Sequence, residues 1–314
     1  MRDITVFSGS AHPELATAIC QRLGVPLSPS TLDRFTNDCL RVQLRANCRE
    51  RDVYIVQPLV PPVQEHLVEL LLMLDAARGA SAARITAVVP HFAYARSDKK
   101  DAPRISIAAR LVADLLATSG MNRMLAMTLH SPQVHGFFSV PVDHLHALRE
   151  LAGHFRTGEL ANSIVVAPDL GYAKEAARFA RLLGLPVAAA AKQRLSDEKV
   201  EISSIIGDVR GRDVVVLDDE IARGSTILEL LDQLKRHEVS SVRVACTHGL
   251  FTDGALARIA ARDEVTEIVC TDTVPIPPTH RGGKLTILSV AAPLAEAMRR
   301  IHDGESVSVL FDAH

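Results

Sequence analysis

The chain of 314 residues is long enough for two domains of ordinary size, and its 47% hydrophobic content is ample for packed cores. Its 35 basic residues nearly balance its 37 acidic ones, and the net charge of −2 argues against a general binder of nucleic acids or of membrane surfaces. With no tryptophan and 4% aromatic residues, the chain has little material for stacking on bases.

Short apolar runs rich in β-branched residues alternate with helical patterns along most of the sequence. This alternation predicts an α/β fold in which mainly parallel sheets are covered by helices on both faces. In chain order, the predicted strands are residues 4–7, 53–57, 85–89, 123–129, 163–167, 187–191, 214–217, 242–247 and 267–271. The predicted helices between them are residues 14–23, 63–78, 105–119, 172–183, 227–236 and 255–261.

The pattern changes near residues 142–155, and similar series of strands and helices lie on either side. We therefore expect two similar domains, an N-terminal one at residues 1–145 and a C-terminal one at residues 146–295. Residues 292–310 predict a final helix and then a strand at 306–311. This tail, from about residue 296 to residue 314, is expected to return to the first domain.

The sequence predicts neither a signal peptide nor a membrane span, and together with the cysteine usage this favours a cytoplasmic location. No apolar run reaches the roughly 18 residues of a membrane span, and residues 1–7 predict a strand and not a signal peptide. Five cysteines are scattered without a Cys-x-x-Cys pair, which is typical of free thiols in a reducing compartment.

The strand at 214–217 leads into Asp218 and Asp219, and then into a turn before the next helix. A helix start presents free backbone N–H groups and a partial positive charge, which together suit a phosphate. Placing two carboxylates beside the helix start would cost electrostatic free energy unless a cation or the hydroxyls of a polyol engaged them. The segment therefore predicts a pocket for a phosphorylated sugar, although an ordinary turn remains the alternative. The turn consists of Ala222, Arg223, Gly224, Ser225 and Thr226.

Polar residues also follow three other predicted strands, where ligands bind in open α/β sheets. Residues 90–100 include Arg96 and Asp98, and arginine suits forked contact with phosphate. His130 follows strand 123–129, and Asp169 follows strand 163–167. The alternatives are a solvated charged loop, a structural histidine and a helix N-cap, respectively.

Lys192 and Arg194 end the small-residue strand at 187–191 with one residue between them. On an extended segment both side chains would point to the same side, where two cations could stabilise charge that develops in phosphoryl transfer. The polar residues 195–199 are expected to form a mobile loop. A surface location is the alternative for this pair.

Taken together and in order, these segments resemble the ribose-phosphate diphosphokinases, also called PRPP synthetases, of the class I type. The resemblance spans nearly the whole chain. It is carried by Arg34-Phe35, Tyr94-Ala95-Arg96, Leu129-His130-Ser131-Pro132-Gln133, Gly136-Phe137-Phe138, Pro141-Val142-Asp143-His144-Leu145, Pro168-Asp169, Lys192-x-Arg194, Asp218-Asp219 and Cys246-Thr247-His248.

The resemblance implies an enzyme of nucleotide biosynthesis that transfers the diphosphoryl group of ATP to the C1 hydroxyl of ribose 5-phosphate, giving PRPP and AMP with Mg²⁺. It also implies two similar phosphoribosyltransferase-type domains and a homo-oligomer built from dimers, usually a hexamer in this family. By position, the ATP-binding residues would be Phe35, Asn37, Asp38, Cys39, Arg96, Ser97, Asp98 and His130. His130 and Asp169 would bind the metal, and Lys192, Arg194 and His130 would be catalytic. Arg194, Asp218, Asp219, Ala222, Arg223, Gly224, Ser225 and Thr226 would bind ribose 5-phosphate.

Three positions depart from the family pattern. Cys39 stands where a glutamate would accept a hydrogen bond from adenine, and a thiol is a weak acceptor. Ser97 replaces a glutamine, and Arg223 replaces a hydroxyl residue in the phosphate loop. The charged catalytic set is intact, which favours an active enzyme. A non-catalytic regulatory subunit, a phosphoribosyltransferase and a diphosphokinase of altered nucleotide or sugar specificity are the alternatives.

Overall fold

The computed structural model describes residues 3–194 and 200–310, with the backbone alone for residues 192–194 and 200–203. The chain forms two units. Unit 1 comprises Met1–His146, Thr273–Pro275 and Ser289–His314, and unit 2 comprises Ala147–Asp272 and Ile276–Leu288. The last helix of the chain therefore belongs to the first unit.

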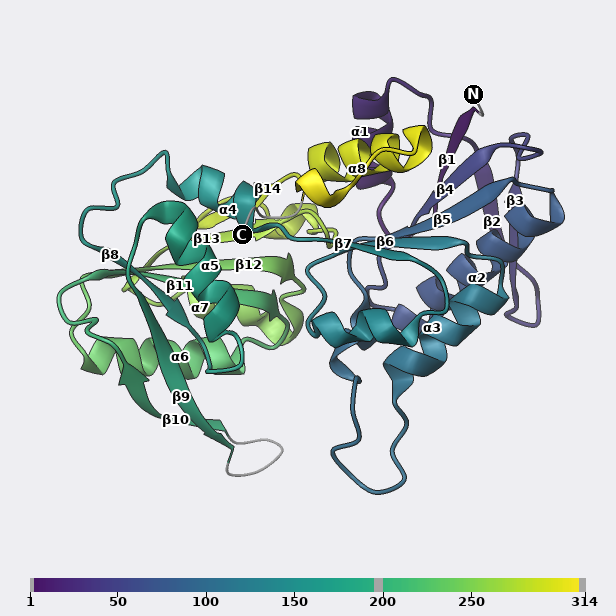
Figure 1. The fold of residues 1–314 in the computed structure, drawn as a ribbon. Helices are drawn as coiled ribbons and strands as arrows, with labels where there is room; N and C mark the ends of the chain where they lie inside the picture. The colour runs from purple at the N-terminus through teal and green to yellow at the C-terminus, as the bar shows by residue number, and fades with distance from the viewer. Residues whose placement is uncertain (1–2, 195–199, 311–314) are drawn as a thin grey trace. The chain divides into compact units, whose positions relative to one another are not determined.

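Unit 1 is built on a parallel sheet of five strands in the order β1-β4-β5-β6-β7. Alternate side chains point to opposite faces, and helices bury both faces, as the continuous apolar strands predict. Helices α2 and α3 cover one face, while α1 and α8 pack side by side on the other (Figure 1). The strands are β1 (Ile4–Ser8), β4 (Asp52–Val56), β5 (Arg84–Val89), β6 (Arg123–Met127) and β7 (Val142–Leu145). The helices are α1 (Pro13–Leu23), α2 (Val63–Gly79), α3 (Ala108–Thr118) and α8 (Ala291–Asp303).

Two further strands of unit 1, β2 (Ser30–Arg34) and β3 (Leu40–Leu44), form a separate antiparallel hairpin that contacts α2. Short 3₁₀ helices follow β5 and β6, namely η1 (Ala93–Arg96) and η2 (Pro132–Phe137). These short turns begin the loops that carry several of the predicted site residues.

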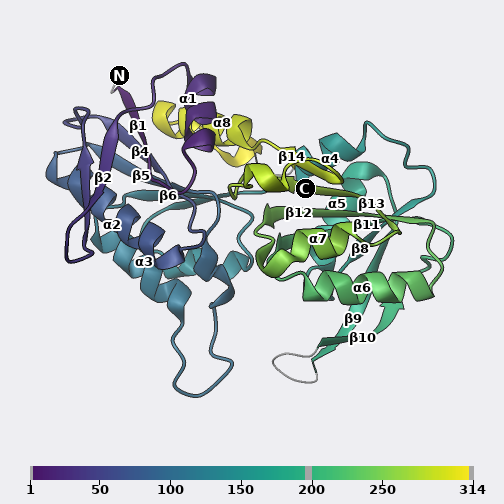
Figure 2. The same ribbon diagram turned by 180° about the vertical axis from the view of Figure 1, so that it is seen from behind.

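Unit 2 is built on a sheet of seven strands in the order β10-β9-β8-β11-β12-β13-β14. All neighbours run parallel except β10, which pairs antiparallel with β9 (Figure 2). One face packs on α4 (Leu148–Phe155) and α5 (Ala173–Leu183), and the other on α6 (Ser225–Arg236) and α7 (Ala255–Ala260). The strands are β8 (Ser163–Ala167), β9 (Val187–Arg194), β10 (Val200–Ile206), β11 (Asp213–Ile221), β12 (Ser241–Gly249), β13 (Val265–Thr271) and β14 (Leu285–Leu288).

The predicted α/β class is confirmed, and every predicted strand up to residue 271 and helix up to residue 261 is present. The strand predicted at 163–167 matches β8 at both ends, and each of the other elements differs from its prediction at one end or both. The predicted strand at 123–129 stops at Met127, because Thr128 takes a positive φ of 44°. Sequence patterns missed β2, β3, β7, β10, β14 and α4, which are short or lie at a sheet edge or in the hairpin.

The strand predicted at 306–311 is wrong for the residues that the structure describes. Ser308–Leu310 is a 3₁₀ turn, η5. The amide of Ser308 donates to Oγ of Ser306 at 3.2 Å, and the two hydroxyl oxygens lie 2.6 Å apart. Such local side-chain hydrogen bonds compete with an extended backbone, so Ser306 and Ser308 favour a turn here in place of the predicted strand.

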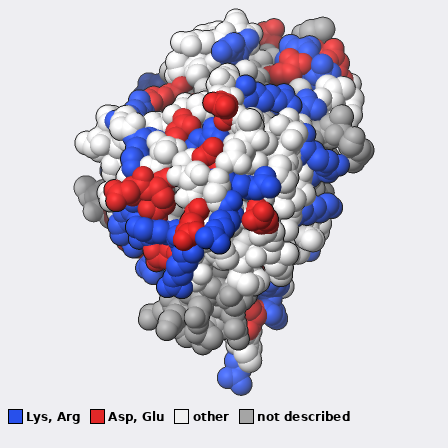
Figure 3. All heavy atoms as spheres, turned by 90° about the vertical axis from the view of Figure 1, so that its left-hand side faces the viewer, with Lys and Arg blue, Asp and Glu red and all other residues white. Residues whose placement is uncertain are grey.

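The surface carries charges of both signs. On the face that Figure 3 shows, Lys and Arg side chains lie interspersed with Asp and Glu side chains, as the near balance of the sequence predicts. Within residues 3–194 and 200–310, helices long and apolar enough to cross a bilayer are absent.

Candidate active site

In unit 2, the carboxyl ends of β8 and β11 bring three aspartates together. The two strands are parallel neighbours, and Val166 pairs with Val216. Asp169 therefore leaves β8 at the level where Asp218 and Asp219 lie on β11. The sequence predicted all three as site residues, and the sheet places them at one edge.

The local electrostatics of these carboxylates is unfavourable without a ligand. Burial, the charge of Asp219 and the charge of Asp169 hold the pKa of Asp218 well above its usual range. The amide of Asp219 donates to Oδ1 of Asp218 at 2.9 Å, which compensates only part of this effect. Burial and the charges of Asp219 and Asp218 also raise the pKa of Tyr172. A cation or the hydroxyls of a polyol would stabilise such a cluster.

Asp169 makes a hydrogen bond in the turn that precedes α5. Its Oδ1 accepts the backbone amide of Tyr172 at 3.0 Å. The N-cap alternative is wrong, because Tyr172 is the N-cap residue of α5 and no side-chain hydrogen bond caps it. The turn contact fixes the direction of the carboxylate, and its second oxygen can still meet a ligand.

The loop after β11 ends in a tight turn at the start of α6. Gly224 takes φ 72°, a backbone conformation that glycine adopts at little cost. A Cβ atom there would lie 3.2 Å from both Cβ of Ala255 and Cδ1 of Ile259. Gly224 is the N-cap residue of α6, and it makes no side-chain hydrogen bond to the first turn of the helix. The helix start thus has the form that the sequence predicted for a phosphate site.

Two residues that the sequence did not point to, Asp253 and Arg258, contact Arg223 and account for its position in the loop. Its Nε lies 2.9 Å from Oδ2 of Asp253, and 80% of its side chain is exposed. Arg258 of α7 donates to the Arg223 carbonyl at 2.6 Å and so restrains the loop backbone. Both partners are distant in sequence, and no local pattern pointed to them. The Arg223 side chain is therefore directed to the surface, where it pairs with Asp253.

Lys192 and Arg194 end β9, the neighbour of β8 on the side away from β11. Their backbones pair with Ile202 and Val200 of β10. The side chains of both residues, and the predicted loop at 195–199, lie outside the described residues. Their catalytic role remains a prediction.

In unit 1, the loops after the neighbouring strands β5 and β6 carry the predicted nucleotide residues Arg96, Ser97, Asp98 and His130. The rings of Phe92 and Phe138 pack between these loops, with centroids 5.9 Å apart, and α3 contacts both η1 and η2. Arg96 and His130 are exposed, while Ser97 and Asp98 are half-buried. Oγ of Ser97 accepts the amide of Ala108 at 3.2 Å, so this hydroxyl helps to begin α3.

The other four predicted nucleotide residues form the exposed tip of the β2–β3 hairpin. Phe35 is 50% exposed, and its ring lies 5.9 Å from the guanidinium carbon of Arg41. Arg34 anchors the tip, because its guanidinium lies 2.7 Å from Oδ1 of Asp38 and 2.6 Å from Oε2 of Glu65 on α2. The tip residues are Phe35, Asn37, Asp38 and Cys39, and Asp38 has φ 69°.

Comparisons with known proteins agree over the full length. A family model described as the N-terminal domain of ribose phosphate pyrophosphokinase matches residues 4–120, and one described as a phosphoribosyl synthetase-associated domain matches residues 189–312. A putative ribose-phosphate pyrophosphokinase of Streptomyces coelicolor is 70% identical over 100% of this chain and 99% of its own. The ribose-phosphate pyrophosphokinase of Deinococcus radiodurans is 49% identical over 98% of each chain.

The chain belongs to the ribose-phosphate pyrophosphokinase family. The crystal structure of phosphoribosylpyrophosphate synthetase from Mycobacterium smegmatis agrees, with a TM-score of 0.89 at 36% identity over 96% of this chain and 100% of that one. The predicted family is confirmed, and with it an enzyme of the transferase class.

Although Asp169, Asp218 and Asp219 lie at one edge of the unit-2 sheet, no three His, Cys, Asp or Glu side chains within residues 3–194 and 200–310 are arranged so that they could hold a metal ion together. The two predicted metal ligands belong to different units, His130 to unit 1 and Asp169 to unit 2. Mg²⁺ is commonly held by one or two carboxylates together with substrate phosphates and water, so a larger protein cluster is not required.

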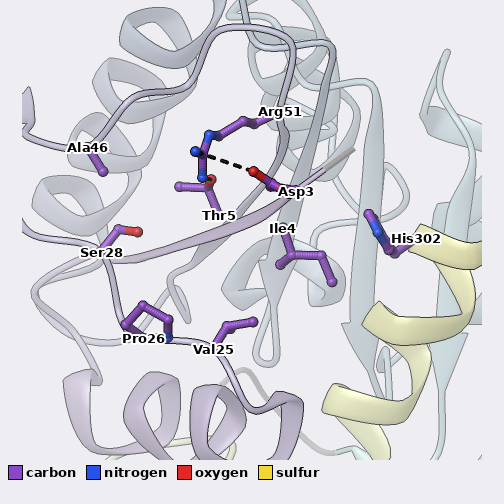
Figure 4. A pocket seen from close by; sticks show the side chains of 9 residues that line it. All are labelled: Asp3, Ile4, Thr5, Val25, Pro26, Ser28, Ala46, Arg51 and His302. Carbon is purple, nitrogen blue, oxygen red and sulfur yellow. Dashed lines mark hydrogen bonds and ion pairs between the residues drawn. The ribbon is translucent and has the colours of Figure 1, made fainter. Parts of the chain in front are cut away.

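A pocket of about 460 Å³ in unit 1 is lined by none of the predicted site residues (Figure 4). It lies at the amino end of β1, opposite to the strand ends that carry the candidate site. The guanidinium of Arg51 lies 3.4 Å from Oδ2 of Asp3 within it. Its lining is Asp3, Ile4, Thr5, Val25, Pro26, Ser28, Ala46, Arg51 and His302.

Proposed function

We propose that the chain transfers the diphosphoryl group of ATP to the C1 hydroxyl of ribose 5-phosphate, giving PRPP and AMP. The observation that carries this proposal is the aspartate group of unit 2 beside the glycine turn of α6, in a chain of the pyrophosphokinase family. Ribose hydroxyls would donate to Asp218 and Asp219, and the 5-phosphate would accept from the first amides of α6. One ligand would thereby engage both the negative and the positive part of the site.

The reaction requires alignment and positive charge more than covalent help from the protein. Lys192 and Arg194, on β9, are proposed to hold the transferring phosphoryl groups and to stabilise the charge that develops on their oxygens. His130 would orient the nucleotide.

A divalent cation suits the carboxylates of unit 2, one of which, Asp169, is a proposed Mg²⁺ ligand. The raised pKa of Asp218, caused by burial and by Asp219 and Asp169, marks an excess of negative charge that a divalent cation would offset. Bound Mg²⁺ would neutralise charge on the β- and γ-phosphates of ATP. Asp169 and His130 are the proposed protein ligands.

Unit 1 is proposed to bind the nucleotide through Arg96, Ser97, Asp98 and His130, and unit 2 to bind the sugar phosphate. The hairpin tip with Phe35 is exposed, as is Leu32 at 40%. Exposed apolar side chains on a projecting hairpin suit a neighbouring subunit. We therefore propose a homo-oligomer built from dimers, of which a hexamer is one form, in which the tip borders the adenine of a neighbour.

A cytoplasmic location is proposed from the cysteines. All five are free thiols, and only Cys39 is exposed. Burial raises the pKa of Cys20 to about 11 and that of Cys270 to about 12, so these thiols resist oxidation.

The test is incubation with ATP, Mg²⁺ and ribose 5-phosphate, with separation of nucleotides and assay of PRPP. AMP formed in equal amount to PRPP is the expected result. ADP as product, or no turnover, would contradict the proposal and leave a regulatory subunit as the better explanation. Parallel incubations with GTP and with other pentose phosphates distinguish an enzyme of altered specificity.

A further inference from the structure

The loop that carries His130 begins with a strained residue. β6 ends at Met127, and Thr128 then takes φ 44°. This left-handed region is unfavourable for a β-branched side chain, so the surrounding structure has to hold the turn in place. His130 follows two residues later, and its direction depends on that turn.

The neighbouring strand β7 holds the turn at two consecutive amides. The amide of Thr128 donates to the carbonyl oxygen of Leu145 at 2.8 Å. The amide of Leu129 donates to Nε2 of His144 at 2.7 Å. In the parallel register, Met127 pairs with Leu145 and Ala126 with His144. The His144 side chain therefore reaches forward along the sheet to the residue that precedes His130.

Burial makes the second bond costly to lose. His144 is 6% exposed and Leu129 is 5% exposed, so water cannot readily replace the imidazole as acceptor. An accepting Nε2 carries no proton, and a neutral ring then has its proton on Nδ1. The ring thus acts in one defined tautomer.

Two neighbouring rings fix the orientation of this imidazole. His135 of η2 packs edge-on against it with centroids 5.1 Å apart. His146, just after β7, packs at 4.3 Å with an angle of 44° between the ring planes. These two ring contacts restrict the orientation of the imidazole whose Nε2 accepts the Leu129 amide.

We propose that His144 is a positioning residue, which holds the Thr128–Leu129 turn and thereby sets the direction in which His130 meets the nucleotide and its metal ion. The consequence for catalysis rests on the proposed role of His130. We call the hydrogen bonds from β7 to the amides of Thr128 and Leu129 the clamp. The clamp is a property of unit 1 and can be measured without substrate or metal.

Two substitutions of His144 distinguish the effect of its hydrogen-bond acceptor from the effect of its size. His144→Gln retains an acceptor at a similar reach, whereas His144→Leu removes it. His144→Met serves as a second apolar variant that fits the site with little steric demand. Val142→Ala on the same strand is the matched control, because it weakens packing without touching the Leu129 amide.

The first measurement is amide hydrogen exchange of the full chain without ligands. We expect exchange at Thr128 and Leu129 to quicken at least tenfold in the Leu and Met variants, and to stay within threefold in His144→Gln and Val142→Ala. The second measurement is the Mg²⁺ concentration for half-maximal activity, with kcat. We expect at least a tenfold loss in kcat or in Mg²⁺ affinity for the Leu and Met variants, with His144→Gln near the parent.

Unchanged exchange in the apolar variants would overturn the clamp. Faster exchange without any kinetic change would overturn its effect on His130, whatever reaction the enzyme performs. If only His144→Gln folds, His144 serves general stability and the positioning role is overturned. Equal kinetic loss in Val142→Ala would overturn it in the same way.

Discussion

Nδ1 of His302 lies 2.9 Å from Oδ2 of Asp52, although 250 residues separate them in the chain. Asp52 begins β4 and is 1% exposed, and His302 lies near the end of α8. The hydroxyl of Tyr54 lies 3.0 Å from both Oδ2 of Asp52 and the carbonyl oxygen of Met298. Arg84 donates to the other carboxylate oxygen at 2.8 Å. This polar group fastens the last helix of the chain to the unit-1 sheet.

Asp52→Asn is expected to destabilise unit 1 by about 3 kcal/mol at pH 7, because it leaves buried partners without their anion. Burial alone would raise the pKa of Asp52, but hydrogen bonds from Arg84, His302 and Tyr54 hold it below the ordinary 3.8. A lowered carboxylate pKa stabilises the fold above the unfolded value and loses that effect as pH falls through the folded value. The difference in Tm between parent and variant should therefore close below about pH 3.8. Asp33→Asn, in an exposed pair with Arg41, should leave Tm unchanged, and equal Tm values for parent and Asp52→Asn at pH 7 would refute the expectation.

Gly224→Ala is expected to raise the KM for ribose 5-phosphate at least tenfold. A Cβ at this position meets Ala255 and Ile259 at 3.2 Å, so the loop has to move away from α7. Gly184→Ala is the matched control, since its φ of 70° is similar and an added Cβ meets nothing within 4 Å. Both variants should lose about 1 kcal/mol from the left-handed backbone, but only Gly224→Ala should change KM. A KM change of equal size in the control would show that the effect is general.

Arg223→Ala is expected to change the KM for ribose 5-phosphate by less than threefold. The side chain is 80% exposed and paired with Asp253, and such surface pairs contribute about 0–1 kcal/mol. Asp253→Ala provides the complementary test, because it would free Arg223 to turn toward the loop. A tenfold rise in KM for Arg223→Ala, together with a fall for Asp253→Ala, would instead show that Arg223 binds the phosphate.

Cys39→Glu is expected to lower the KM for ATP by about threefold to tenfold, the effect of one added hydrogen bond of roughly 1 kcal/mol. The residue is exposed at the tip of the hairpin, so the longer side chain meets no steric barrier within its own unit. Cys39→Ser controls for loss of the thiol and should leave KM unchanged. Steady-state kinetics with ATP and GTP would measure both affinity and base selectivity, and an unchanged ATP KM for Cys39→Glu would rule out the missing carboxylate as a determinant.

The strand–helix alternation was readable from sequence because fully buried parallel strands such as β8, with the apolar run at residues 164–167, consist largely of apolar residues and alternate with helices. Short edge strands lack this signal. Val142–Leu145 contains Asp143 and His144, and its pairing with β6 is a long-range contact that no local pattern reveals. The strand expected at the chain end failed for a local reason, the hydrogen bonds between Ser306 and Ser308.

In the candidate site too, some residues could be predicted from the sequence and others could not. Asp169, Asp218 and Asp219 were found because each follows an apolar strand, and parallel neighbours bring such positions to one edge. The supporting residues were not found, because their contacts exist only in the folded chain. Arg258 reaches the Arg223 carbonyl from another helix, and His144 reaches the Leu129 amide from another strand.

Asp218→Asn is expected to stabilise the ligand-free protein while it abolishes activity. Burial and the charges of Asp219 and Asp169 raise the pKa of Asp218, so its ionised form costs folding energy at neutral pH. For a raised carboxylate pKa, the parent gains stability as pH falls through the folded value, and the variant should lack that gain. At pH 7 the variant should have the higher Tm, by about 2–4 °C for each kcal/mol of relieved repulsion. Mg²⁺ should raise the Tm of the parent more than that of the variant.

Asp213→Asn is the matched control for this prediction. Asp213 begins β11 at the opposite end of the strand, where its Oδ1 accepts from the hydroxyl of Ser241 at 2.6 Å. This substitution should neither raise Tm nor alter its response to Mg²⁺. Thermal unfolding from pH 4 to pH 8, with and without Mg²⁺, measures both effects alongside kcat. A lower Tm for Asp218→Asn at pH 7 would mean that the ligand-free carboxylate cluster is already compensated, and the argument for a cation or sugar at this site would lose its electrostatic basis.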